Sequence, residues 1–298
     1  MSAPLSYYLL LTALYLSPFP LSIIIITLKS QAMKTTYYPS IWISDVHLGY
    51  KDCKAKFLLD FLNKTECDVL YLVGDIVDLW SMKRQFFWDP SHYQVLECIQ
   101  KKAEAGTRVI YIPGNHDETF RHYGGQTLFK VEVHKTFIHI TSAGKRFLLL
   151  HGDDFDSATR YNKLISLIGD AAYDFLLFLN RWTNRVRRLY GGHYWSLASW
   201  LKQRVHKARE AIAAFENAAI HEAKKQGVDG IICGHIHQPE IRVVDGIVYC
   251  NDGDWIENCT ALVENQAGRI ELLHWSDVQS VLSVVEMESM ETNNVKAA

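Results

Sequence analysis

The fold is decided by one stretch of sequence, in which Val69-Leu70-Tyr71-Leu72-Val73 runs into Gly74-Asp75-Ile76-Val77-Asp78. A short apolar run of strand-forming residues, bounded by turn residues, predicts a buried β-strand. Gly74 permits a sharp turn where this strand ends. Asp75 then lies at the carboxyl end of the strand, where open α/β sheets bind their ligands. The stretch therefore predicts an α/β sheet with a carboxylate at its edge that could bridge two metal ions.

Four other apolar runs end in the same way, in Asp, Asn or His and mostly beside a glycine. The residues that follow these runs are Asp45 with His47, Asn115 with His116 and Asp117, His151, and His235 with His237. The side chains of residues i and i+2 of an extended chain point the same way, so both residues of each Asp-x-His or His-x-His pair can face one site. A lone Asp or His at a strand end is more often structural, but so many at matching places predict a metal site.

The five motifs, taken in order, resemble those of the calcineurin-like metallophosphoesterases. They read Asp-x-His, Gly-Asp-x-x-Asp, Gly-Asn-His-Asp, His-Gly and Gly-His-x-His, and the resemblance extends roughly over residues 37–275. It implies an α/β fold, a four-layer α/β/β/α sandwich. The eighty residues between the last two motifs are too many for a simple loop and predict a helical cap insertion at about 157–226.

The resemblance also implies a centre of two divalent metal ions. The implied ligands are Asp45, His47 and His237 for the first ion, Asn115, His151 and His235 for the second, and Asp75 as the bridge. Carboxylate, imidazole and amide donors suit Mn²⁺, Fe²⁺ or Zn²⁺, and we expect Mn²⁺. Such a pair turns a shared water into a hydroxide that attacks phosphorus in line with the leaving oxygen.

The same resemblance implies roles for three further residues. His116 is expected to stand over the leaving group as general acid or charge stabiliser. Asp117 is expected to orient His116. Asp78 is expected to hold a metal ligand or the backbone in place.

The predicted insertion is basic and amphipathic. Residues 157–226 contain twelve Lys or Arg and five Asp or Glu, in a chain whose net charge is −2. Apolar residues recur at helical spacing on both sides of Gly191-Gly192, which predicts two or more helices packed as a hairpin. A basic insertion between two metal motifs favours a cap over an anionic, amphiphilic substrate. The alternative is a plain helical pair with solvated charges.

The insertion and the stretch from Asn251 to Trp255 are similar to those of the UDP-2,3-diacylglucosamine pyrophosphatases of lipid A synthesis. Those enzymes carry Arg after the metal-binding Asn, whereas this chain carries His116. The resemblance implies hydrolysis of UDP-2,3-diacylglucosamine to UMP and the lipid sugar phosphate. Candidate substrate-binding cations are Arg84, Arg121, Arg187 and Arg188.

Two other functions stay open. One is a phosphodiesterase or phosphatase that acts on another nucleotide or phospholipid-like substrate. The other is a non-catalytic scaffold on the same fold, although scaffolds of that kind lose ligands or the catalytic histidine. The charge balance and the loops give no sign of nucleic-acid binding, and the oligomeric state is not encoded in any pattern.

Three segments divide the chain. Residues 1–32 are apolar but interrupted by Pro18 and Pro20, and they fit an irrelevant extension, a membrane anchor or a cleaved signal. Residues 33–276 form the predicted catalytic domain, and 277–298 form a polar tail that we expect to fray. Six cysteines without paired spacing favour a reducing cytoplasm. We expect a cytoplasmic protein, peripheral to or anchored in the inner membrane.

Several local elements are also predicted. Helices are expected over 54–63 and 91–105, and an aromatic, partly basic loop over 79–90. Strands are expected over 131–141 and 145–150. The alternating runs between 240 and 275 favour a second sheet packed on the first.

Overall fold

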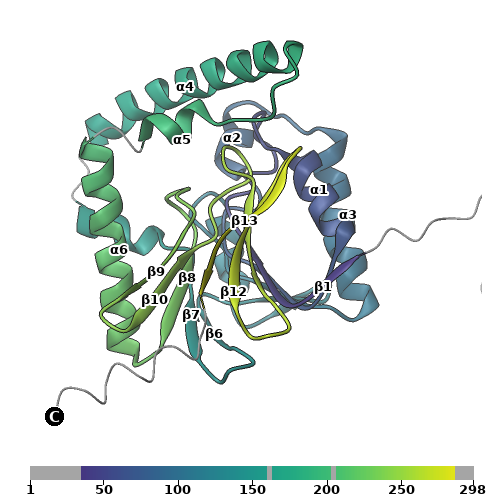
Figure 1. Ribbon diagram of the computed structural model, residues 1–298, viewed down its shortest axis with the longest axis vertical. Helices are drawn as coiled ribbons and strands as arrows, with labels where there is room; N and C mark the ends of the chain where they lie inside the picture. The colour runs from purple at the N-terminus through teal and green to yellow at the C-terminus, as the bar shows by residue number, and fades with distance from the viewer. Residues whose placement is uncertain (1–34, 160–162, 203–205, 286–298) are drawn as a thin grey trace, which may run out of the picture. The chain divides into compact units, whose positions relative to one another are not determined.

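A computed structural model describes residues 35–285, except 160–162 and 203–205. Two β-sheets pack face to face, and helices cover their outer faces (Figure 1). This arrangement confirms the predicted four-layer α/β/β/α sandwich. In the part of the chain described, no helix is both long and apolar enough to cross a bilayer. Residues 1–32, with their three interpretations, lie outside the described residues.

The first sheet has eight strands in the order β13-β12-β11-β1-β2-β3-β5-β4. Their bounds are β1 Thr36–Ile43, β2 Thr65–Leu72, β3 Arg108–Tyr111, β4 Thr127–Leu128, β5 Val131–Val133, β11 Thr260–Glu264, β12 Ile270–Trp275 and β13 Gln279–Val285. Strands β1, β2, β3 and β5 run parallel. Their carboxyl ends therefore meet at one edge, and the first three metal motifs follow β1, β2 and β3 there.

The second sheet has five strands in the order β6-β7-β8-β10-β9. Their bounds are β6 Phe137–Ile140, β7 Arg146–Leu149, β8 Gly230–Cys233, β9 Glu240–Val244 and β10 Ile247–Asn251. Strands β7 and β8 are parallel, so the last two motifs, which follow them, also emerge at one edge. Between the sheets lies an apolar layer in which Trp42 and Tyr71 stack with ring centroids 5.5 Å apart.

Helices α1 (Ala55–Lys64) and α3 (Pro90–Ala105) cover the first sheet. Helix α1 buries Leu58, Phe61 and Leu62, which recur at helical spacing. Helix α3 begins after Asp89, whose carboxylate accepts from Ser91 N–H, and ends at a glycine with φ of 113°. The predicted loop over 79–90 contains a short helix, α2 (Leu79–Arg84). Two 3₁₀ segments, η1 (Glu118–Tyr123) and η2 (Asp153–Thr159), follow metal motifs.

The insertion contains α4 (Lys163–Leu189), α5 (Leu197–Lys202) and α6 (His206–Gln226). The predicted helical hairpin forms only in part, because α5 folds back on α4, where the Leu197 N–H donates to Asn180 Oδ1 at 2.8 Å, but α6 packs elsewhere. Helix α6 packs on the outer face of the second sheet through Phe215, Ala219 and Ile220, whereas α4 lies with α5 across one end of the sandwich (Figure 1). Periodicity identified an apolar face on α6, but that face is covered by β8 and β10 instead of by α4.

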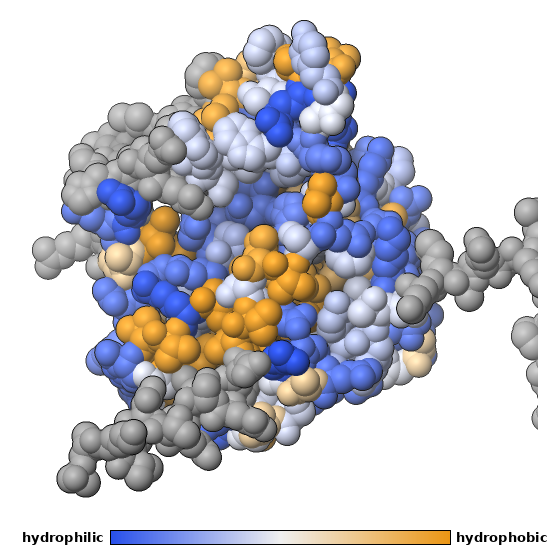
Figure 2. Space-filling model, in the orientation of Figure 1, coloured by the Kyte–Doolittle hydropathy of each residue, from blue (hydrophilic) through white to orange (hydrophobic). Residues whose placement is uncertain are grey.

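Three other expectations need correction. The strand predicted over 131–141 is two strands, β5 in the first sheet and β6 in the second. Strands β11 and β12 join the first sheet, not the second. Within the predicted frayed tail, β13 pairs with β12 along the sheet edge. Its Val281, Leu282 and Val284 are exposed, and Figure 2 shows apolar side chains on this face. Because its backbone is held by β12, the strand forms without burying these side chains.

Candidate metal centre

The loops that follow the strands hold their polar residues in an unusual backbone conformation. The φ angle is positive at five predicted ligands, with values of 48° at Asp45, 52° at His47, 53° at Asp75, 69° at His235 and 53° at His237. Residues other than glycine rarely adopt this conformation, and it is concentrated at functional sites. Backbone hydrogen bonds fix the first loop on the second, from Asp45 N–H and His47 N–H to carbonyls at 3.0 and 2.9 Å. The backbone is therefore in a strained conformation at these residues, and this conformation directs their side chains inward.

The glycines of the motifs leave room for ligands from other loops. A Cβ atom on Gly74 would lie 2.2 Å from His151 Nδ1, and one on Gly114 would lie 2.2 Å from Asp75 Oδ1. These separations are far below van der Waals contact. The glycine beside each ligand is thus needed because a second ligand occupies the space of its side chain.

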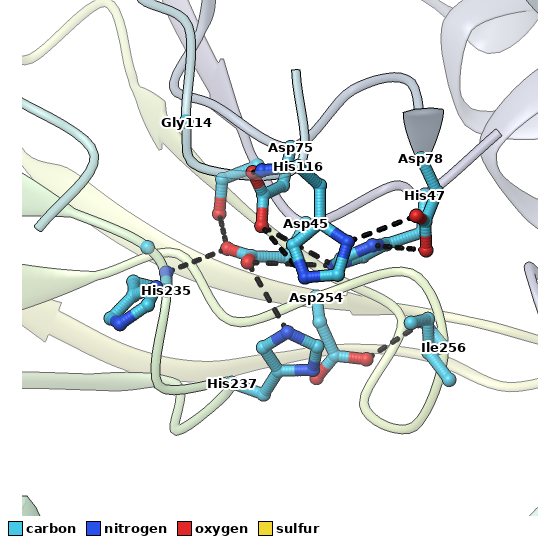
Figure 3. A network of polar contacts seen from close by, with 12 residues as sticks. Asp45, His47, Asp75, Asp78, Gly114, His116, His235, His237, Asp254 and Ile256 are labelled. Carbon is cyan, nitrogen blue, oxygen red and sulfur yellow. Dashed lines mark hydrogen bonds and ion pairs between the residues drawn. The ribbon is translucent and has the colours of Figure 1, made fainter. Parts of the chain in front are cut away.

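One cluster of potential metal ligands consists of Asp45, His47 and His237 (Figure 3). Asp45 Oδ1 lies 3.2 Å from His237 Nε2 and 3.8 Å from His47 Nε2. Asp45 Oδ1 and His47 Nε2 are buried and make no hydrogen bond within the described chain. Buried polar atoms without partners are costly, about 1–3 kcal/mol each. Orphaned atoms that converge in this way fit a metal ion.

A second cluster is formed by Asp45, Asp75 and His151. Asp75 Oδ2 lies 3.4 Å from His151 Nε2 and 3.7 Å from His47 Nε2, so it contacts ligands of both clusters. His151 Nδ1 donates to the Val73 carbonyl at 2.9 Å, which leaves the Nε2 atom facing Asp75. Asn115 Oδ1 lies 3.3 Å from the same Nε2 atom. Asp75 thus occupies the position expected of a bridging ligand.

His235 is placed differently from the other predicted ligands. Its backbone N–H donates to Asp45 Oδ2 at 2.8 Å, and its ring lies 5.1 Å from the ring of His151. Its Nε2 atom, however, lies 2.9 Å from Asp156 Oδ1. Sequence reasoning did not single out Asp156, although it stands in an acidic run directly after the His-Gly motif.

Charges in the site stabilise one another. Burial alone would raise the pKa of Asp45, but His237 and His47 hold it well below its usual range. Burial likewise opposes the charged form of His151, yet Asp75 raises the pKa of His151 to about 10. The centre therefore favours positive charge among its carboxylates, whether protons or metal ions supply it.

Asp78, and not Asp117, orients His116. His116 Nδ1 lies 2.9 Å from Asp78 Oδ1, while the other oxygen of Asp78 lies 3.1 Å from His47 Nδ1. Asp117 accepts backbone N–H bonds from Gly114 at 2.6 Å and Ile76 at 2.7 Å. The predicted pairing of Asp117 with His116 is wrong, because the Asp117 carboxylate accepts from backbone N–H groups of its own loop and of the loop after β2. Asp117 holds the two loops together.

The His116 ring faces the cluster at a partly open position. Its Nε2 atom lies 4.0 Å from Asp75 Oδ2, and 26% of its side chain is exposed. Trp80 packs on the ring, with centroids 4.4 Å apart. A group in this position can reach both the metal centre and an incoming ligand.

The model of the family described as calcineurin-like phosphoesterase matches residues 38–239 of this chain. The chain belongs to this family. The match covers all five metal motifs and most of the sandwich. Together with the donor clusters, it supports a dimetal site and identifies a metal-dependent phosphoester hydrolase.

Curated relatives extend over most of the chain. A UDP-2,3-diacylglucosamine hydrolase of Hahella chejuensis is 28% identical over 212 residues, covering 68% of this chain and 82% of its own length. One of Xanthomonas campestris pv. campestris (strain B100) is 29% identical over 238 residues, covering 75% and 94%. Among solved structures, the phosphoesterase Yfce from E. coli is 14% identical with a TM-score of 0.45, covering 83% of this chain and 97% of its own.

The phosphoesterase has a cavity of about 420 Å³ directly at the metal centre. His47, His116 and His237 line it. Its other walls carry Asp78, Gly49, Tyr50, Lys51, Trp80, Ser81, Arg84, Gln85, Phe87 and Ile256. Helix α4 borders this cavity, because its buried Leu177 packs on Ile256 beside Tyr50.

The four candidate substrate cations of the phosphoesterase lie in different surroundings. Arg84 lines the cavity at the metal centre. Arg121 donates two hydrogen bonds to Asp153, at 2.7 and 2.8 Å. Arg187 lies over the Trp195 ring, and Arg188 lines an adjoining cavity. The structure therefore brings one of the four to the metal centre itself.

The stretch from Asn251 to Trp255 supports the last metal loop of the phosphoesterase. Asn251 Nδ2 donates to the Gly234 carbonyl at 2.7 Å, and Asp252 Oδ1 accepts from Ser44 Oγ at 2.6 Å. Asn258 Nδ2 donates to the His237 carbonyl at 3.0 Å. Sequence reasoning missed Ser44 and Asn258, which carry no signal beyond their closeness to motifs.

Proposed function

We propose that this phosphoesterase hydrolyses the phosphate anhydride of UDP-2,3-diacylglucosamine and releases UMP and the lipid sugar phosphate. The observation that carries the proposal is the cavity at the metal centre, which has both cationic walls, Lys51 and Arg84, and apolar walls, Trp80, Phe87 and Ile256. Such a surface suits a phosphate that is attached to an apolar group. The names of the relatives support the same substrate.

Different residues of the chain bind the metal ions, position the catalytic histidine and assist the leaving group. Asp45, His47, Asp75, Asn115, His151, His235 and His237 would hold two divalent ions, with Mn²⁺ the ion we propose. When bound, these ions acidify a water and neutralise the phosphoryl oxygens. Asp78 holds both His47 and His116, so that one carboxylate links the metal centre to the group above it. His116 donates a proton or a hydrogen bond to the leaving oxygen.

A second candidate is hydrolysis of another nucleotide or phospholipid-like phosphodiester. His116 favours it, because an imidazole beside a carboxylate can give a proton to a basic leaving group, whereas an arginine cannot. A non-catalytic scaffold is the weakest candidate. Five of the seven predicted ligands, Asp45, His47, Asp75, His151 and His237, lie in the two clusters, and His116 is backed by Asp78 and Trp80.

We also propose that the protein works in the cytoplasm, at the surface of the inner membrane. The support comes from α4, on which Phe178 is 52% and Trp182 is 60% exposed, followed by exposed Leu189 and Tyr190. Aromatic side chains at a surface favour the interface of a bilayer. Sedimentation with anionic liposomes should fall for Trp182→Ser with Leu189→Ser, and stay unchanged for the exposed Tyr93→Ser on α3. Equal sedimentation of all three proteins would contradict this proposal.

The test of the substrate uses the chain from Met33 onward with Mn²⁺. Hydrolysis of UDP-2,3-diacylglucosamine is measured beside bis-p-nitrophenyl phosphate, for the wild type, His116→Ala and Asp75→Ala. His134→Ala is the control, since His134 lies outside the metal loops. We expect UMP release by the wild type and control, reduced at least 100-fold in the other two. Turnover of the synthetic diester alone would contradict the lipid substrate and favour the second candidate.

A further inference from the structure

A second cavity adjoins the cavity at the metal centre. Its volume is about 390 Å³, and the first turns of α1 and α3 and the last turn of α4 line it. It shares Lys51 and Phe87 with the metal cavity, so the two cavities meet at these side chains. None of the seven predicted metal ligands lines it.

The second cavity carries an excess of positive charge. Its charged side chains are the cations Lys51, Lys54, Lys56 and Arg188 and the carboxylate Asp89. Within the described residues, none of the four cations forms an ion pair, although Lys54 Nζ donates to the Asp52 carbonyl at 2.7 Å and lies over the Tyr194 ring. Asp89 accepts hydrogen bonds from the N–H and hydroxyl of Ser91 and so serves as the cap of α3. Four cations against one engaged carboxylate favour an anionic ligand.

His92 adds an uncharged donor to the same cavity. The residue is only 2% exposed, and its Nδ1 atom accepts the Gly49 backbone N–H at 3.0 Å. Because Nδ1 accepts, the neutral ring carries its proton on Nε2. Burial lowers the pKa of His92 and so favours this neutral form. Since His92 lines the cavity and its Nδ1 is engaged by Gly49, the Nε2–H group can serve a ligand with acceptor oxygens.

We propose that this cavity binds a phosphate group other than the one that is cleaved. Phosphate oxygens accept hydrogen bonds from ammonium, guanidinium and imidazole N–H groups alike. Phe57 and Phe87 offer apolar faces to the carbon skeleton that carries the phosphate. Since the cavities meet at Lys51 and Phe87, one substrate can place the scissile phosphate at the metals and a second phosphate here.

The ligand has two sources, a distal phosphate of the substrate or free phosphate. The first source rests on the proposed phosphoester hydrolysis and requires a substrate of the second candidate class, since UDP-2,3-diacylglucosamine carries no phosphate outside the cleaved anhydride, whereas the second source does not. Two thymidine 5′-(p-nitrophenyl phosphate) esters distinguish them, one with and one without a 3′-phosphate. Their hydrolysis by the metal-loaded chain is measured together with calorimetric binding of inorganic phosphate, which gives a result even if neither ester is cleaved.

The variant to test is Lys56→Gln with Arg188→Gln, because both side chains are exposed and neither lines the metal cavity. The control is Lys64→Gln with Lys101→Gln, which removes the same charge near the far ends of α1 and α3. We expect the variant to raise KM for the 3′-phosphorylated ester about tenfold or more and to leave KM for the other ester within twofold. The control should leave both unchanged.

Loss of one phosphate-binding event in the variant, with both KM values unchanged, would support the cavity with free phosphate as its ligand. Unchanged phosphate binding together with unchanged KM ratios in the variant would overturn the proposal. Equal weakening in the variant and the control would also overturn it, because the effect would then come from net charge and not from the cavity.

Discussion

At the scale of single residues, Asp78 is the carboxylate on which the geometry of the site depends. It contacts His47 and His116 and also accepts from the N–H and hydroxyl of Ser81. Asp78→Asn should lower kcat 10- to 100-fold, because a residue behind a metal ligand typically has that effect. Asp117→Asn should leave kcat within a few-fold. Both variants should lower the free energy of unfolding by about 1–3 kcal/mol, since each new amide would face groups that donate to the carboxylate. Kinetics and thermal unfolding of both variants separate these roles, and a kcat loss confined to Asp117→Asn would contradict the assignment.

Gly114 provides a second residue-scale prediction. Gly114→Ala should weaken metal binding at least tenfold, because the new methyl group would displace Asp75 or His151. Gly124→Ala is the control, since its Cβ would meet only the Arg121 carbonyl, at 3.3 Å. Titration with Mn²⁺ followed by calorimetry tests this, and wild-type affinity of Gly114→Ala would show that the loop can open.

The motifs were sufficient to predict which residues gather at this site, but not how each carboxylate is used. Asp78 and Asp117 stand at similar distances from the ligands in sequence. Which of them reaches His116 depends on the left-handed turn at Asp75 and on the N–H groups that this turn exposes to Asp117. Such backbone detail has no signature in residue type.

At the scale of elements, polar contacts anchor the α4–α5 part of the insertion to the sandwich. Tyr194 Oη donates toward the carbonyls of Ile256 and Glu257, at 3.2 and 2.9 Å, and Arg181 of α4 pairs with the buried Asp52. Tyr194→Phe should remove about 1 kcal/mol of anchoring and speed proteolysis within the insertion severalfold. The exposed Tyr93→Phe is the control. Identical cleavage of both variants and the wild type would mean that this anchor does not hold the insertion.

The helices of the insertion were predictable from their spacing, whereas their partners were not. Amphipathic spacing predicts that one face of a helix is buried, but it does not predict which element covers that face. Helix α6 packs on the second sheet, whereas α4 packs on the loop that contains Ile256. The split of 131–141 between two sheets has the same cause, because alternation marks strands without assigning them to a sheet.

At the scale of the whole molecule, the fold buries the carboxyl group of Glu216, which makes stability depend on pH. Burial and the neighbouring Glu240 raise the pKa of Glu216 to about 7, although Arg242 opposes the shift. The folded state therefore binds more protons than the unfolded state between pH 4.5 and about 7, and stability falls as the pH rises through this window. Glu216→Gln should reduce the change in the free energy of unfolding across this pH window by on the order of 2 kcal/mol. The control Glu97→Gln should leave that change as it is in the wild type. Chemical unfolding at several pH values tests this, and parallel curves would contradict it.

The most direct test of the two-metal centre is the number of ions that the folded chain retains. Purified protein, Asp75→Asn and the control Asp153→Asn are dialysed against Mn²⁺, and bound metal is counted by mass spectrometry alongside hydrolysis of bis-p-nitrophenyl phosphate. The proposed arrangement predicts about two ions per chain in the wild type and control. It predicts fewer than two in Asp75→Asn, with activity lost in parallel. Two ions retained by Asp75→Asn, or a wild type active with none, would contradict the bridging site.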